Sequence, residues 1–362
     1  MADRQTPVFT LTGTPKARGE AYGEAARSLV HEAADRWSEN IARGLRMTLD
    51  AYLGELVDNT GFRGAVEQHT PALLDELAGL ARASGVEERL LFAMNLLDEE
   101  WWLRRKIAAT GATPAGEAAH CSGFGIPPQG GGPAYVGQNM DLPGWMDGLQ
   151  VLLDIRPGDG PAALVPSWPG MVALDGVNEH GVGVCVNTLA QLPTSTAGLP
   201  VAFVIRSVLG QPDRAHAREL LNEIPHASGQ NYVIGDPTGV ADVECSAAGA
   251  VDYSTGDSWF AHTNHPLADS HQDEVAPTDN GSQDRSAPRL THLTQRLGEL
   301  DDAVPSELGA ILAEAPLCRG TDGDPGFTLY STVMELADAP VLHLSAGPPS
   351  LYPLVSYPVM QT

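Results

Sequence analysis

The first third of the chain has the hydrophobic spacing of amphipathic helices. Apolar residues recur at intervals of three and four, most clearly at Leu73, Leu74, Leu77, Leu80 and Ala81. After a short strand at 8–12, we expect a helix over 16–56, with Gly19 and Gly23 as weak points. Two further helices are expected near 65–84 and 86–108, and Pro71 is expected in the first turn of the earlier one.

After residue 120 the pattern changes to short apolar runs separated by turn residues, which is typical of strands. The expected strands are 122–126, 134–140, 150–155, 172–178, 182–188, 231–234, 241–246, 258–263, 328–336 and 341–344. Helices are expected near 201–209, 214–223, 290–300 and 306–314. The stretch 269–289 is polar and acidic with two prolines, so we expect an exposed loop there. This succession predicts a layered sheet with helices on its faces.

Composition narrows the classes of function. The 362-residue chain can form one large domain or two ordinary ones, and its 43% of hydrophobic residues is normal for a globular protein. The formal net charge of −25 argues against nucleic acid and anionic membrane as partners, because both require a basic surface. The sequence has no secretory signal pattern, no long apolar run and no C-x-x-C pair. We therefore expect a reduced, cytoplasmic protein.

Cys121 lies where the two patterns meet. The residues before it, 109–118, have the composition of a linker, and the first expected strand follows it directly. A lone cysteine is most often a packing residue. Cys121 differs because three polar segments elsewhere in the chain accompany it: Gly137-Gln-Asn-Met-Asp141, Thr263-Asn264-His265 and Cys318-Arg319.

The pair His262 and His265 has a spacing that could suit a metal ion. No third ligand recurs nearby, and the segment has the pattern of a strand end, so a structural role is favoured over metal ligation. We expect no metal and no cofactor.

Three further segments, 13–23, 94–99 and 328–335, belong to the same pattern. The order and spacing of all these segments, from about residue 10 to residue 345, resemble those of a known family. It comprises the autoproteolytic acyltransferases and hydrolases related to isopenicillin N acyltransferase, within the N-terminal-nucleophile hydrolases. The resemblance implies an α+β fold of four αββα layers, with two stacked antiparallel sheets between helical layers. It also implies that the precursor cuts itself between His120 and Cys121. Residues 1–120, mainly helical, and 121–362, the catalytic part, would remain associated as one domain.

An N-terminal cysteine supplies both the nucleophile and the base that activates it. A free thiol has a pKa of about 8.5 and is only partly ionised at neutral pH, so it requires a base. The α-amino group of a newly exposed Cys121 would have a pKa of about 7.7–8.0 and could accept the thiol proton, then return it to the leaving amine. Before cleavage, the same thiol could attack the His120 carbonyl and form a thioester that water resolves.

Three residues are candidates to assist Cys121. Asp141 could hold the new amino group, although a carboxylate at a strand end also caps turns. Asn264 could donate its amide to an oxyanion, a contribution of about 3 kcal/mol in comparable sites, or could be a turn residue. Arg319 could be a fixed cation near Asp141 or the substrate, or a surface arginine. Further pocket candidates, for which packing is the alternative, are Asn139, Asn187, Trp101, Trp102 and Trp145.

Two positions depart from the family pattern. His120 stands where a small residue is expected before the nucleophile, so its side chain could slow or assist cleavage. Gly123 stands where a hydroxyl residue often follows two positions after it.

The favoured function is therefore hydrolysis of an N-acyl or aminoacyl amide, a small-molecule substrate, through an acyl-cysteine. One alternative is acyl transfer to an amine, for example in secondary metabolism; an acyl-CoA donor would favour a basic cluster that this acidic chain lacks. Another is an uncleaved, non-catalytic binding protein, against which the intact set Cys121, Asp141, Asn264 and Arg319 argues.

Overall fold

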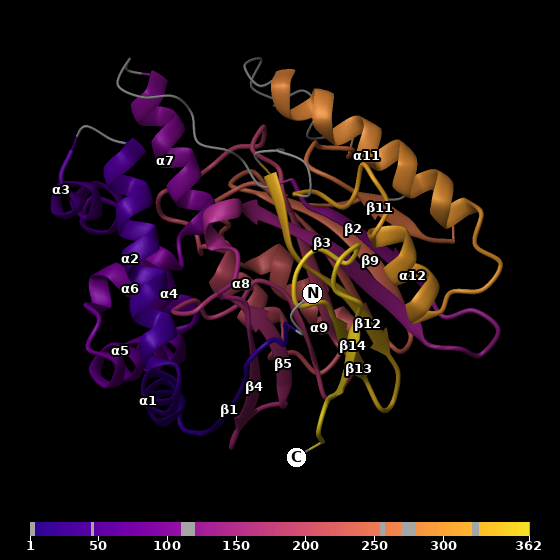
Figure 1. The fold of residues 1–362 in the computed structure, drawn as a ribbon, viewed down its shortest axis with the longest axis horizontal. Coiled ribbons are helices and arrows are strands. Elements are labelled where there is room, and N and C mark those ends of the chain that lie inside the picture. Colours follow the sequence, from indigo (N-terminus) through magenta and orange to yellow (C-terminus); the bar gives the residue numbers. More distant parts are fainter. Residues whose placement is uncertain are drawn as a thin grey trace.

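Two β-sheets lie face to face in the centre of the molecule, and helices cover their outer faces (Figure 1). This computed structural model describes residues 4–44, 47–109, 120–253, 258–268, 280–320 and 326–361. The strand order is β1-β4-β5-β6-β7-β8-β9-β10 in the larger sheet and β11-β2-β3-β12-β13-β14 in the smaller one. Strands β2 and β3 of the smaller sheet pack against β7, β8 and β9 of the larger sheet.

The strands follow the predicted ones closely. Those of the larger sheet are β1 (Val8–Gly13), β4 (Val151–Pro157), β5 (Ala163–Ser167), β6 (Gly176–Asn178), β7 (Gly183–Thr188), β8 (Gln230–Asp236), β9 (Gly239–Ser246) and β10 (Gly249–Tyr253). Those of the smaller sheet are β2 (Ser122–Ile126), β3 (Ala134–Pro143), β11 (Phe260–His262), β12 (Gly326–Leu336), β13 (Val341–Leu344) and β14 (Val355–Pro358). The sequence pattern missed β5, β10 and β14. The last two are the short edge strands of the two sheets, and their residues are largely exposed or half-buried, so they lack a core-facing pattern.

Helices form the two outer layers and confirm the expected αββα arrangement. On the larger sheet, α8 (Val201–Val208) contacts α9 (Arg214–Glu223), and α9 packs on β8, β9 and β10. On the smaller sheet, α11 (Asn280–Gly298) packs on β2 and β11, and α12 (Pro305–Leu312) packs on β12. A second, smaller hydrophobic cluster lies beneath α11 and α12 and includes Phe124, Leu293, Leu308 and Leu312.

One strand pair departs from the expected antiparallel sheets. Strand β1 runs parallel to β4, with Val8 opposite Leu152, whereas every other strand pair in the described chain is antiparallel. A parallel pair requires a long crossover connection. The N-terminal helices, together with β2 and β3, stand between the two strands and supply it.

The N-terminal helical segment is more divided than predicted. The expected helix over 16–56 is in fact α1 (Pro15–Ala25), α2 (Arg27–Gly44), α3 (Leu49–Leu53) and the π-helical turn Gly54–Asp58. The two helices expected after it are α4 (Phe62–His69), α5 (Pro71–Ser84), α6 (Glu88–Met94) and α7 (Leu97–Ala109). Pro71 does begin α5, as predicted. The linker predicted at 109–118 lies, except for its first residue, outside the described residues.

Gly19 and Gly23, expected to be weak points, are the contact surface of α1. A Cβ atom at Gly19 would lie 1.8 Å from the Glu76 carbonyl oxygen of α5, and one at Gly23 would lie 2.7 Å from the Leu80 carbonyl oxygen. On the facing helix, a Cβ at Gly79 would lie 2.3 Å from the Lys16 carbonyl oxygen. The two helices can approach this closely only because these positions lack side chains.

The prediction of a loop over 269–289 is wrong for its second half. Residues 280–289 belong to α11, which continues through Pro288 to Gly298. The polar composition and the proline masked a helix whose buried positions are Ser286, Arg289, Leu293 and Leu297. This correction places Arg289 inside the protein.

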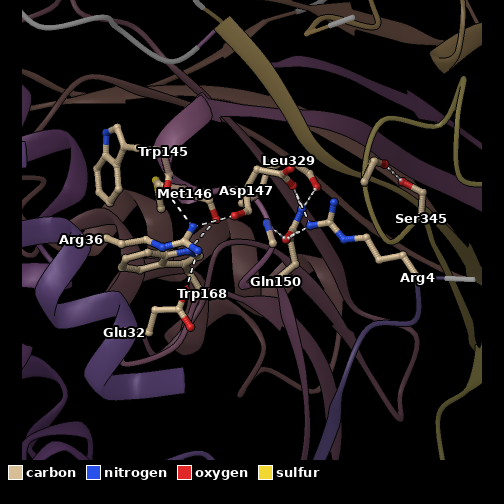
Figure 2. Close-up of polar contacts among 12 residues, drawn as sticks. Arg4, Glu32, Arg36, Trp145, Met146, Asp147, Gln150, Trp168, Leu329 and Ser345 are labelled. Atoms are coloured by element: carbon tan, nitrogen blue, oxygen red, sulfur yellow. Dashed lines mark hydrogen bonds and ion pairs between the residues drawn. The ribbon is translucent and has the colours of Figure 1, made fainter. Parts of the chain in front are cut away.

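Polar contacts tie the N-terminal segment to the loop that follows β3 (Figure 2). Arg4 Nη2 donates to Asp147 Oδ1 at 2.6 Å and to Gln150 Oε1 at 2.5 Å. Arg36 Nη1, on α2, donates to the carbonyl oxygens of Trp145 at 3.1 Å and Asp147 at 2.7 Å. These contacts join residues on opposite sides of the His120–Cys121 bond.

In the part of the chain that the structure describes, no helix is both long and apolar enough to cross a bilayer.

Candidate active site

Cys121 immediately precedes β2, at the start of the strand. Strands β2 and β3 are antiparallel neighbours, with Ser122 opposite Asn139, as predicted. The cysteine is buried, and its Sγ lies 3.8 Å from Met140 Sδ and 3.9 Å from the Asp141 carbonyl oxygen on β3. The register of this one hairpin therefore brings residues 20 positions apart into contact.

Arg289 of α11 binds the backbone on both sides of the His120–Cys121 bond. Its Nη1 donates to the His120 carbonyl oxygen, to the Cys121 carbonyl oxygen at 2.6 Å and to Ser122 Oγ at 2.8 Å. Its side chain is buried at 2% exposure. Burial lowers the pKa of Arg289 to about 10, while the nearby Asp141 opposes this shift, so the group still carries its charge at neutral pH.

Asp141 lies beside Cys121, and Arg319 lies beside Asp141. Thr328 Oγ1 of β12 donates to Asp141 Oδ1 at 2.6 Å, and Arg319 Nη1 lies 4.0 Å from Asp141 Oδ2. The same threonine hydroxyl accepts from the Arg319 backbone N–H at 2.9 Å. Both charged side chains are buried, so Arg319 is not a surface arginine. Their catalytic roles stay predictions.

Asn264 reaches the same cluster through Arg289. Its Oδ1 accepts from Arg289 Nη2 at 2.9 Å, and its Nδ2 donates to the Thr188 carbonyl oxygen at 3.1 Å. One of its two amide hydrogens is therefore engaged with β7. The oxyanion role predicted for Asn264 stays untested.

Burial dominates the acidity of the Cys121 thiol. Loss of solvation raises its pKa well above the ordinary value, the charges of Asp141 and Asp98 raise it further, and Arg289 acts in the opposite sense. The thiol is therefore protonated in the uncut chain at neutral pH.

A small apolar cavity of about 30 Å³ opens beside Cys121. This volume has room for about one water molecule. Asp98, in the first turn of α7, and Thr188 are its polar members, and Thr188 Oγ1 donates to Asp98 Oδ2 at 3.0 Å. The apolar lining is Leu97, Met140, Leu142, Met171, Ala173, Leu174, Val186, Val201, Ala202 and Ile205.

A second cavity of similar size shares Asp98 and Thr188 with the first. Its other walls are Trp101, Trp102, Ala190, Thr194, Ser228 and Gly229. Ser228 Oγ donates to the buried Glu99 at 2.8 Å. Burial, with the neighbouring Asp98, raises the pKa of Glu99 to about 8, so this carboxyl is largely protonated at neutral pH. Two of the tryptophans singled out from the sequence therefore line a space that adjoins the cysteine cavity.

The remaining pocket candidates divide. Asn187 of β7 is buried beside β2: a Cβ at Gly123 would lie 3.0 Å from its Oδ1, which explains the glycine. Neither side-chain amide atom of Asn187 has a hydrogen-bond partner among the residues that the structure describes. Asn139 lines neither cavity; it donates to the Leu312 carbonyl oxygen at 2.9 Å and accepts from Ser331. Trp145 also lines neither and packs edge-on against Trp168 (Figure 2).

The two histidines near Asn264 make different contacts. His262 is fully buried, with Nε2 at 3.0 Å from Glu244 Oε1. His265 Nδ1 lies 2.7 Å from Ser286 Oγ of α11. These contacts tie the end of β11 to β9 and to α11, which is a structural use of both rings.

Sequence reasoning missed Arg289, Asp98 and Ser122. A signal for Arg289 was present: Leu293 and Leu297 mark the buried stripe of a helix, and Arg289 lies one turn before Leu293 on that stripe. An arginine at a buried position needs partners, so its site would have been predicted to be polar.

Comparisons with known proteins found one matching family and several similar solved structures. The model of a family described as acyl-coenzyme A:6-aminopenicillanic acid acyl-transferase matches residues 129–312, just over half of the chain. No curated protein matches. A solved structure of a mutant of the conjugated bile acid hydrolase from Clostridium perfringens is similar, with 17% identity, 61% of this chain and 88% of that chain covered, and a TM-score of 0.40. A solved structure of penicillin V acylase from Agrobacterium tumefaciens is also similar, with 17% identity, 63% of this chain and 84% of that chain covered, and a TM-score of 0.38.

Proposed function

Because the chain belongs to the acyl-coenzyme A:6-aminopenicillanic acid acyl-transferase family, and is thus an enzyme of the hydrolase and acyltransferase class, we propose that it is a self-processing cysteine amidohydrolase. It cuts its own His120–Cys121 bond and then hydrolyses an N-acyl or aminoacyl amide through an acyl-cysteine. The observation that carries the proposal is the buried cluster at the start of β2, where Asp141 and Arg289 lie beside Cys121.

In the cut enzyme, the α-amino group of Cys121 is the base. With a pKa near 7.7–8.0 it accepts the thiol proton, and the thiolate attacks the substrate carbonyl. The amine then returns the proton to the departing nitrogen, and a water molecule resolves the acyl-cysteine by the same route. Asp141 lies on the strand beside Cys121, and its charge favours the protonated amine. Arg319, 4.0 Å from Asp141, holds that carboxylate in place.

The apolar lining of the cavity beside the thiol favours an apolar acyl group, although the walls must move apart to admit one, since the present volume is only about 30 Å³. Ten of its lining residues carry apolar side chains, and two of them are methionines, whose flexible side chains can make room for a longer group. Asp98 and Thr188 line both this cavity and the tryptophan-lined one. We assign the acyl chain to the apolar cavity and the amine portion of the substrate to the tryptophan side.

The two pieces of the cut enzyme remain together in this proposal. Strand β1 pairs with β4 across the cut, and Arg4 and Arg36 bind the loop after β3 (Figure 2). Residues 1–120 and 121–362 therefore form one domain whose core contains side chains from both pieces.

Acyl transfer to an amine is the second candidate function. The family description supports it, since its reference activity is an acyl transfer. The two functions share the acyl-cysteine and differ only in the acceptor. Incubation with an N-acyl amide, with and without an added amine, separates them: hydrolysis releases the free acid at the same rate in both cases, whereas transfer converts the added amine to a new amide.

Intact mass spectrometry under denaturing conditions tests the proposal. We expect two polypeptides, 1–120 and 121–362, from the wild-type protein. Cys121→Ala should remain a single chain without activity, because both cleavage and acylation require the sulfur. Cys245→Ala, which removes another buried cysteine, is the matched control and should be cut and active. A full-length wild-type protein that hydrolyses amides would refute the N-terminal-amine mechanism, and one without activity would support a binding protein.

A further inference from the structure

Arg289 contacts the bond that self-cleavage would break. Its Nη1 donates to the oxygen of the His120 carbonyl, which is the carbonyl that the Cys121 sulfur must attack. Three more contacts hold the guanidinium in this orientation: the Cys121 carbonyl oxygen at 2.6 Å, Ser122 Oγ at 2.8 Å and Asn264 Oδ1 at 2.9 Å. The donor is therefore fixed on the scissile carbonyl before any reaction takes place.

We propose that Arg289 is the electrophilic residue of self-cleavage, which stabilises the negative charge that develops on the His120 oxygen. In the first step the sulfur forms a bond to the carbonyl carbon, and the electron pair of the C=O bond moves onto the oxygen beside Nη1. When this intermediate collapses, the C–N bond breaks, and the Cys121 nitrogen takes up the proton that the thiol has lost. Water then adds to the thioester, the C–S bond breaks, and the sulfur regains a proton.

A charged donor suits this position better than a neutral one. The site is buried, so the field of a full charge on the developing oxyanion is screened little. The other candidates make different contacts in the uncut chain: Asn264 donates one amide hydrogen to the Thr188 carbonyl oxygen, and Arg319 Nη1 lies 4.0 Å from Asp141 Oδ2. The same charge also favours the Cys121 thiolate, against the effect of burial.

Burying a guanidinium costs free energy unless its donors are satisfied. A purely structural cross-link between α11 and β2 would need no positive charge. A neutral amide could bind the same carbonyl and hydroxyl oxygens. The structural and electrophilic roles therefore differ in one respect, namely the need for positive charge, and the experiment should vary charge and hydrogen bonding separately.

This inference rests on the proposed self-cleavage, and its test follows cleavage directly. The full-length chain is synthesised in a cell-free translation system, and the conversion to 1–120 and 121–362 is followed over time by denaturing electrophoresis. The variants are Arg289→Met, which removes charge and donors, Arg289→Gln, which keeps donors without charge, and Arg289→Lys, which keeps charge. Arg285→Met, an exposed arginine one turn earlier on α11, is the matched control. Thermal unfolding of each purified variant reports on folding.

We expect Arg289→Met and Arg289→Gln to be cut about 10²–10³-fold more slowly than wild type, as for the loss of an oxyanion donor elsewhere. Arg289→Lys should be cut faster than Arg289→Gln, and Arg285→Met should match wild type. If Arg289→Met fails to fold, the comparison of the Gln and Lys variants decides. Wild-type cleavage rates in Arg289→Gln would overturn the role of Arg289 and leave self-processing intact. A wild-type chain that is never cut would instead overturn self-processing itself, and this inference with it.

Discussion

Replacing Glu76 by Gln should destabilise the protein by an amount that can be worked out from its contacts. Glu76 of α5 is buried between two arginines: Arg18 Nε donates to Oε2 at 3.0 Å and Arg206 Nη1 donates to Oε1 at 3.0 Å. All three side chains are between 6% and 8% exposed. The amide leaves two buried guanidinium groups without a counter-charge, and removing one partner of a buried ion pair costs about 3–5 kcal/mol.

The expected shift in melting temperature follows from the size of the chain. An unfolding entropy of about 2.1 cal/mol/K per residue gives roughly 0.8 kcal/mol/K for 362 residues. Glu76→Gln should therefore lower Tm by about 4–7 °C in differential scanning calorimetry. The matched control is Glu88→Gln. It breaks the Arg63–Glu88 pair, whose side chains are 46% and 37% exposed, and should change stability by at most about 0.5 kcal/mol.

The difference between wild type and Glu76→Gln should also depend on pH. Burial by itself would raise the pKa of Glu76, but Arg206 and Arg18 bring it below its ordinary value of 4.5. A carboxyl with a lowered pKa contributes its full stability above the ordinary value and loses it as the pH falls through the folded-state value. The Tm gap should be constant from neutral pH down to about pH 5 and narrow at lower pH. A gap no larger than that of Glu88→Gln, or one that widens in acid, would refute the reasoning.

Three further substitutions test other parts of the structure. Asp141→Asn should lower amide turnover by about 10²–10⁴-fold, measured by steady-state kinetics, because it removes the charge beside Cys121; unchanged turnover would exclude a role in catalysis. Gly123→Ser should slow cleavage and turnover, since its Cβ would crowd Asn187 Oδ1 at 3.0 Å; wild-type rates would contradict this. Gly19→Ala should lower Tm, because its Cβ would lie 1.8 Å from a backbone oxygen of α5, whereas Gly64→Ala, with open space around it, should raise Tm slightly.

Much of the fold could be predicted because it follows from local patterns. Strand β2 was predicted with its observed bounds, since its apolar run is delimited by Cys121 on one side and by proline-rich turn residues on the other. Helix α9 was likewise predicted with its observed bounds, from the spacing of its apolar residues. The first half of α11 was not, because its polar residues and Pro288 match a loop, and packing on β2 and β11 overrides that preference.

The residues of the candidate site also differ in whether the sequence could identify them. Cys121 was identified by the change in pattern on either side of it, and Asp141, Asn264 and Arg319 by their resemblance to a family. Arg289 could not be assigned to the Cys121 backbone, because 168 residues separate them. Asn139 was a pocket candidate with packing as the alternative, and its side chain does pack, donating to the Leu312 carbonyl oxygen of α12.

The sequence by itself determined most of the elements and their order, the change from helices to strands at Cys121, and the chemistry available there. These properties depend on residue type and on spacing within a few turns of helix or a single strand. Only the tertiary structure decided that a helix predicted as loop lays a buried guanidinium on the His120 carbonyl, and that Asn187 lies against Gly123. The physical reason is that such contacts join distant segments, so they are set by how sheets and helices pack rather than by any local preference.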